Sequence, residues 1–186
     1  MKSRKLTSMI LLILSALMIM VSCKKDDEPE VDPLVGTYVF SSATFNEAVS
    51  IVIQDVQVDF AASSDATQFV GPGLLSAAPC ANPQNAAIEL REVGTAFIVC
   101  LTEVIEEQLG TWSINSGRTI LTVNISNPQP FVLTIEDLTI TSNSFTGTVT
   151  NFPLPINTAY ALGEPIPDNG FNYQTASVDV TFTKVP

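Results

Sequence analysis

The sequence offers few side chains that could do chemistry, and histidine is absent from all 186 residues. Without histidine the chain cannot build a Ser-His-Asp or Cys-His catalytic centre, a histidine zinc site or the usual proton shuttle near neutral pH. Three cysteines remain (Cys23, Cys80 and Cys100), together with nineteen carboxylates. Carboxylate pairs such as Glu89 with Glu92 could in principle catalyse a hydrolysis, but these two fall at a predicted hairpin turn, where acids are normally just solvated. We therefore predict a protein that is not an enzyme, with no cofactor and no metal site.

The N-terminus has the pattern of an export signal. Lys2, Arg4 and Lys5 precede an apolar run from 9 to 21, which would rise about 20 Å as a helix and so fall short of a bilayer core of about 30 Å. This pattern predicts a secretory signal peptide. The segment Met20-Val21-Ser22-Cys23 resembles the lipobox of bacterial lipoproteins, which implies that Cys23 is lipidated and becomes the first mature residue. An ordinary signal peptide that happens to contain a cysteine is the alternative.

The segment after Cys23 is too polar to pack. Two lysines are followed by four acids within five residues, so we expect a solvated tether that ends near Pro33. A cysteine followed by lysine and an acidic cluster resembles the surface-export signal of Bacteroidota lipoproteins, which implies the outer membrane with the protein facing the cell exterior. The lipid is the only membrane anchor that we predict. The predicted organisation is a signal peptide over 1–22, the lipidated cysteine and acidic tether over 23–33, and one β domain over 34–186.

The composition fits one compact domain and narrows the choice of partners. Apolar residues make up 46% of the chain and charged residues 15%, and a domain of this size can bury a core without an obligatory staple. Acids outnumber bases 19 to 8, and the predicted cleavage would remove three of those bases. Because the chain could neutralise few phosphates, nucleic acid is not an expected partner.

From residue 34 onward the dominant hydrophobic period is two, which predicts strands. Val178, Val180 and Phe182, for example, alternate with one aspartate and two threonines. An apolar face opposite a threonine-rich face is typical of antiparallel sheet with one wet side, and no segment predicts a convincing amphipathic helix. Short connections favour an all-β fold, either an antiparallel up-and-down barrel or a curled β-sandwich of eight or nine strands. The predicted strands cover 35–45, 50–60, 87–92, 95–101, 110–115, 118–126, 131–141, 144–151 and 176–184.

One predicted strand contains a break in its alternation. Leu133 and Ile135 share a face, but the next apolar pair, Leu138 and Ile140, begins three residues after Ile135 instead of two. One extra residue at Glu136-Asp137 would keep both pairs on the inner face, so the sequence predicts a β-bulge there. Bulges bend strands and help a sheet to close.

A short motif occurs twice, as Gly36-Thr37-Tyr38 and as Gly110-Thr111-Trp112, with Cys80 and Cys100 between the two copies. This order resembles the lipocalin-like domain of Bacteroidota lipoproteins, and the resemblance covers about residues 34–184. It implies a small antiparallel barrel of the calycin type. The family has no established reaction and no agreed ligand, so the resemblance implies neither for this chain.

Cys80 and Cys100 are predicted to form a disulfide. In an exported protein whose Cys23 carries the lipid, these two are the remaining thiols, and thiols outside the cytoplasm are normally oxidised. A redox-active pair is the alternative, but the close C-x-x-C spacing is absent. Trp112 is expected to close one end of the core rather than to contact a ligand.

Two predicted connections are long, 61–86 and 152–175, and long loops in compact domains are usually functional or disordered. The second is rich in aromatic residues, so we expect it to be the recognition site of a non-enzymatic module that binds a small apolar or glycan ligand. The alternatives are that these rings only anchor their loop, and that the protein is a structural or accessory surface lipoprotein with a filled barrel core and a protein partner. The candidate ligand-binding residues are Tyr160, Phe171, Tyr173, Asn169 and Asn172.

Overall fold

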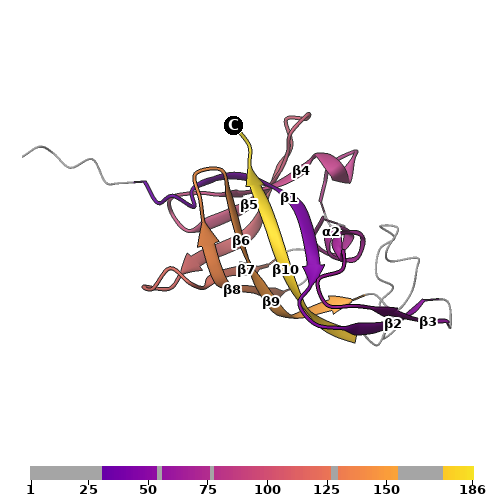
Figure 1. The fold of residues 1–186 in the computed structure, drawn as a ribbon. Helices are drawn as coiled ribbons and strands as arrows, with labels where there is room; N and C mark the ends of the chain where they lie inside the picture. Colours follow the sequence, from indigo (N-terminus) through magenta and orange to yellow (C-terminus); the bar gives the residue numbers. More distant parts are fainter. Residues whose placement is uncertain (1–30, 54–55, 76–77, 127–129, 155–173) are drawn as a thin grey trace, which may run out of the picture. The chain divides into compact units, whose positions relative to one another are not determined.

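The computed structural model describes residues 31–186 apart from 54–55, 76–77, 127–129 and 155–173. The chain divides into two units, Met1–Val31 and Asp32–Pro186, and the second unit holds the elements that follow. Eight of its strands close into a barrel in the order β1-β10-β9-β8-β7-β6-β5-β4 (Figure 1). The strands are β1 (Gly36–Phe45), β4 (Ala86–Leu90), β5 (Thr95–Cys100), β6 (Glu106–Ile114), β7 (Leu121–Ile125), β8 (Phe131–Ile140), β9 (Ser144–Leu154) and β10 (Gln174–Lys184).

Antiparallel pairing runs all the way round this barrel. From β4 to β10 each strand pairs with the next one in the sequence, and β1 closes the ring by pairing with β10 on one side and β4 on the other. The predicted all-β class is confirmed, and the architecture is the closed up-and-down barrel, a lipocalin-like arrangement, rather than the curled sandwich. In the described part of the chain, no helix is both long and apolar enough to cross a membrane.

The two-residue period of the sequence becomes the two faces of the barrel wall. In β10, Val178, Val180 and Phe182 are buried inside. Asp179 between them points outward, where its Oδ1 accepts a hydrogen bond from Thr148 Oγ1 at 2.6 Å. Burying one such apolar side chain stabilises a fold by about 1.5–3 kcal/mol, so a one-residue slip of this strand would place its apolar set in water.

The bulge predicted in β8 is present. The register between β8 and β9 shifts between Glu136 and Thr139, and Asp137 has a φ of 49°. Leu133, Ile135 and Leu138 are buried, and Ile140 is half-buried against the core. Gly147 of β9 faces the bulge, and a Cβ at this position would lie 2.5 Å from the Glu136 carbonyl oxygen and 2.6 Å from Ile135 Cγ2. The missing side chain is therefore a requirement of close backbone approach and leaves no space for a ligand.

The single strand predicted over 50–60 is wrong. The structure has two strands there, β2 (Val49–Ile53) and β3 (Val56–Phe60). They pair with each other in a separate two-stranded sheet that extends away from the barrel (Figure 1). The apolar alternation runs over positions 49, 51 and 53 before the turn and over 56, 58 and 60 after it. This shift of phase was the local signal that one continuous strand does not fit the segment.

The sequence predicts no convincing amphipathic helix, and the structure contains a short helix of another kind. Helix α2 (Thr67–Leu75) and the 3₁₀ turn η2 (Pro83–Asn85) lie within the connection predicted over 61–86. The helix contains Pro72 and two glycines, residues that disfavour helical backbone by about 3 and 1 kcal/mol each. It forms because Phe69 and Val70 are buried and the helix packs against β1 and β9. Tertiary packing thus overrides a poor local propensity.

Aromatic rings occupy the inside of the barrel. The Phe145 ring centroid lies 4.8 Å from those of both Tyr38 and Phe182, and Phe40 lies 5.7 Å from Phe182. Gly71 of α2 lies against this group, since a Cβ there would be 3.2 Å from the Phe40 ring. The mixed sizes of the inward residues therefore correspond to an interior packed by side chains and by the helix.

Candidate functional site

The predicted cysteine pair is joined. Cys80 and Cys100 form a disulfide with their Cα atoms 5.5 Å apart, and both are buried. Cys100 is the last residue of β5, and Cys80 lies between α2 and η2. The prediction is confirmed, and the bond ties the segment that leads into β4 to the end of the neighbouring strand.

The other predicted site residues fall outside the described residues. These are Cys23 and the five candidate ligand-binding residues Tyr160, Phe171, Tyr173, Asn169 and Asn172. The strands that flank the candidate loop are described, and their register pairs Leu154 with Gln174. The loop therefore leaves and re-enters the barrel wall at one place.

The two ends of the barrel are covered by different elements. We call the end where β1 begins and β10 ends the base, and the opposite end, where β1 ends and β10 begins, the mouth. Trp112, expected to close one end of the core, is buried toward the base, and its Nε1 donates a hydrogen bond to the Arg91 carbonyl at 2.9 Å. The disulfide and the Leu154–Gln174 pair belong to the mouth.

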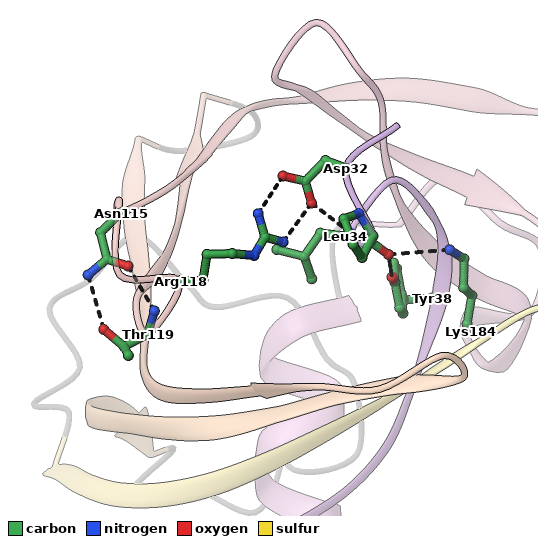
Figure 2. A network of polar contacts seen from close by, with 8 residues as sticks. Asp32, Leu34, Tyr38, Asn115, Arg118, Thr119 and Lys184 are labelled. Carbon is green, nitrogen blue, oxygen red and sulfur yellow. Dashed lines mark hydrogen bonds and ion pairs between the residues drawn. The ribbon is translucent and has the colours of Figure 1, made fainter. Parts of the chain in front are cut away.

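A bidentate ion pair holds the chain across the base (Figure 2). Arg118 donates two hydrogen bonds of 2.8 Å to the two carboxylate oxygens of Asp32, and Asp32 Oδ1 also accepts one from the Leu34 amide at 2.9 Å. Arg118 has a φ of 56° in the turn between β6 and β7, where the Asn115 side chain accepts a hydrogen bond from the Thr119 amide. Leu34 is fully buried, so the pair fixes a segment that seals the core.

Lys184, the last residue of β10, adds a second set of polar contacts at the base (Figure 2). Its Nζ donates a hydrogen bond to the Val35 carbonyl at 2.7 Å and lies 5.7 Å from the Tyr38 ring centroid. The Tyr38 hydroxyl donates to the Pro33 carbonyl at 3.3 Å. Gly36 makes room for the lysine, since a Cβ there would lie 2.3 Å from Lys184 Cε. The first and last strands are thus joined through polar contacts.

The polar contacts at the base shift the pKa values of three side chains. Hydrogen bonds from Arg118 hold the pKa of the Asp32 carboxyl below its ordinary value, and the same bonds raise the pKa of Arg118. Burial raises the pKa of the Tyr38 hydroxyl, and the negative charge of Asp32 adds to the effect. Arg118 and Asp32 bond each other, and Asp32 and Tyr38 bond the backbone of residues 33–34. The arrangement therefore holds the fold rather than presenting a nucleophile.

Sequence reasoning missed this network. It assigned Asp32 to the tether and gave no role to Arg118 or Lys184. A signal existed, because Arg91, Arg118 and Lys184 are the bases of the chain after residue 25. In so acidic a sequence each remaining base is a candidate for a specific partner.

The Asp32–Arg118 pair should make stability depend on pH in acid. Because Asp32 has a folded pKa below its ordinary value of 3.8, the pair stabilises fully above that pH, and its contribution is lost as pH falls through the folded pKa. The two side chains are 29% and 40% exposed, so we expect about 1 kcal/mol or less at neutral pH. Unfolding of wild type and Asp32→Asn, measured across pH, should differ by a constant amount at neutral pH and converge below 3.8. A difference that stays the same on acidification would contradict the pairing.

One carboxylate considered for hydrolysis belongs to an outer ion-pair group. Arg91 Nη2 lies 2.6 Å from both Glu89 and Glu106, and its guanidinium carbon is 3.8 Å from the Phe97 ring centroid. Arg91 thus joins both carboxylates through charge-assisted hydrogen bonds. The arrangement favours a structural contact between β4, β5 and β6 over acid–base chemistry.

Two segments of the mouth carry exposed apolar side chains. Leu101, Val104 and Ile105 lie in the turn between β5 and β6, and Phe131 and Val132 begin β8. A group of exposed apolar residues on a soluble domain is typical of an interaction surface. Of the described part of the molecule, the mouth therefore provides the candidate recognition site.

Comparisons of the chain with protein-family models, with curated proteins and with solved structures found no match.

Proposed function

We propose that the chain is a non-enzymatic lipoprotein, anchored through Cys23 to the outer membrane and facing the cell exterior, whose barrel is a scaffold for recognition at the mouth. The observation that carries this proposal is the packed interior, in which the Phe145 ring centroid lies 4.8 Å from the Tyr38 ring centroid and 4.8 Å from the Phe182 ring centroid. A small barrel filled by side chains recognises partners with its surface rather than with a central cavity. The geometry therefore favours the filled-core interpretation, with a protein partner.

The lipid anchor can be tested directly. Growth with a fatty-acid analogue should label the wild-type chain and leave Cys23→Ala unlabelled, because the thioether to Cys23 would carry the lipid. The double variant Cys80→Ser, Cys100→Ser is the matched control and should keep its label. Equal labelling of wild type and Cys23→Ala would overturn the anchor.

A second candidate is a small apolar or glycan ligand held at the mouth by the aromatic-rich loop. The observation in its favour is the pairing of Leu154 with Gln174, which fixes both ends of that loop to adjacent barrel strands. Binding proteins commonly carry their recognition loops on a rigid sheet in this way. Tyr160, Phe171 and Tyr173 would supply stacking faces or apolar walls. Asn169 and Asn172 would orient the ligand by hydrogen bonds.

Thermal unfolding in the presence of fatty acids and glycans separates the two candidates. A ligand present at 100 times its dissociation constant adds about 2.7 kcal/mol to stability, so a true ligand should raise the melting temperature. Tyr160→Ala and Tyr173→Ala should abolish that rise without changing the melting temperature of the free protein. A loss of several kcal/mol in the free variants would show instead that the rings anchor their own loop, and an absence of any rise would favour the filled scaffold.

A further inference from the structure

The turn that joins β5 to β6, residues 101–105, presents apolar side chains to solvent. Val104 is 109% exposed, Leu101 44% and Ile105 40%. Hairpin turns normally use Gly, Asn, Asp or Ser, because these residues suit the turn backbone. Three exposed aliphatic residues in five positions are typical of a surface that a partner covers.

This β5–β6 turn is also held in one conformation. Its preceding residue, Cys100, is bonded to Cys80. The Leu101 amide donates a hydrogen bond to the Asn85 carbonyl at 2.9 Å, and the Asn85 side chain donates to Thr102 Oγ1 at 2.8 Å. A pre-ordered surface loses little conformational entropy on association. The fixed conformation of the turn therefore favours binding to a partner.

The surrounding charge indicates which kind of partner fits. Glu103 and Glu107 flank Val104, and the Glu103 carboxylate accepts a hydrogen bond from the Ala81 amide at 3.1 Å. Glu106 adds a third carboxylate, which is paired with Arg91. Such an acidic surround is repelled by an anionic lipid surface and attracted by a protein surface with lysine or arginine.

We propose that the β5–β6 turn docks with Val104 as its anchor into an apolar pocket of a partner protein, and that basic side chains line the rim of this pocket. This inference rests on the proposed function, since it names the partner surface of the same anchored scaffold. The disulfide and the contacts of Asn85 set the turn before the partner arrives. The carboxylates of Glu103 and Glu107 then face the basic rim.

Photocrosslinking of the full-length chain in the cells that produce it tests the site of contact. Benzoylphenylalanine is placed at 104 and, as the matched control, at 93, because Val93 is another turn valine, 83% exposed and at the base. Position 104 should give one protein adduct that position 93 does not give. Adducts of equal yield at both positions, adducts with lipid alone, or no adduct at 104 would overturn the proposal.

Affinity measurements with the purified adduct partner then test the chemistry. Val104→Ser should weaken binding about tenfold or more, since burying a valine contributes about 1.5–3 kcal/mol, and Glu107→Lys should weaken it further by reversing the charge. Val93→Ser should bind like wild type, and all variants should keep the wild-type melting temperature because these side chains are exposed. Unchanged affinity in Val104→Ser, or equal binding to phosphatidylcholine vesicles, would overturn the docking mode. Cys23 labelling is read separately, so a labelled chain without an adduct refutes this inference alone.

Discussion

Phe182→Ala is expected to lower the free energy of unfolding by about 3–5 kcal/mol, the range for removing a buried phenylalanine. Phe182 is 1% exposed and lies between two other rings, with centroids 4.8 Å from Phe145 and 5.7 Å from Phe40. The substitution removes contacts on both sides and leaves a hole that the closed wall can collapse into only partly. Urea or thermal unfolding, followed by circular dichroism, measures the loss.

Phe131→Ala is the matched control for this experiment. Phe131 begins β8 at the mouth and is 39% exposed, so its removal forfeits less buried area and should cost clearly less than the change at Phe182. If both substitutions cost the same, the interior is not packed as described. In that case the proposal of a filled scaffold would lose its main support.

The second large effect is expected from the disulfide. The double variant Cys80→Ser, Cys100→Ser should lose about 3 kcal/mol, because the bond closes a loop of about 20 residues and restricts the unfolded chain. The sequence separation of the two cysteines is 20. Thermal unfolding of the double variant under oxidising conditions gives the value.

Reduction of the wild type supplies the control for the disulfide. Treatment with a phosphine reductant should lower the melting temperature of the wild type to that of the double variant, and should leave the variant unchanged. Alkylation of the unreduced, unfolded wild type should find no thiol at Cys80 or Cys100. Stoichiometric modification of either residue would refute the bond.

Most of the barrel was predictable because its signals are local. Alternation placed β1, β5 and β8 within one residue of their observed ends, and a three-residue step in that alternation was enough to locate the bulge near Asp137. The pairing of Cys80 with Cys100 followed from export and the number of thiols. None of these predictions required knowledge of which strands lie side by side.

The errors arose where tertiary contacts decide. Helix α2 contains Pro72 and two glycines, and it is helical because Phe69 and Val70 are buried against strands. The β2–β3 turn was missed although the apolar alternation shifts by one residue across it, from 49, 51 and 53 to 56, 58 and 60. The base network joins Asp32 to Arg118, 86 residues apart in sequence, and such a pairing has no local pattern. Periodicity therefore predicted the wall, while the helix at the mouth and the network at the base needed coordinates.

The contact of Lys184 Nζ with the Val35 carbonyl, 2.7 Å, means that the domain begins and ends at the same place. A ring of antiparallel strands has no structural first member, so a circularly permuted chain that joins 186 to 32 through a short linker would preserve every strand pair. The natural order instead places both ends of the domain at the base. Insertions in the connections of the mouth can then vary in length and composition without altering the contacts that join the two ends of the domain.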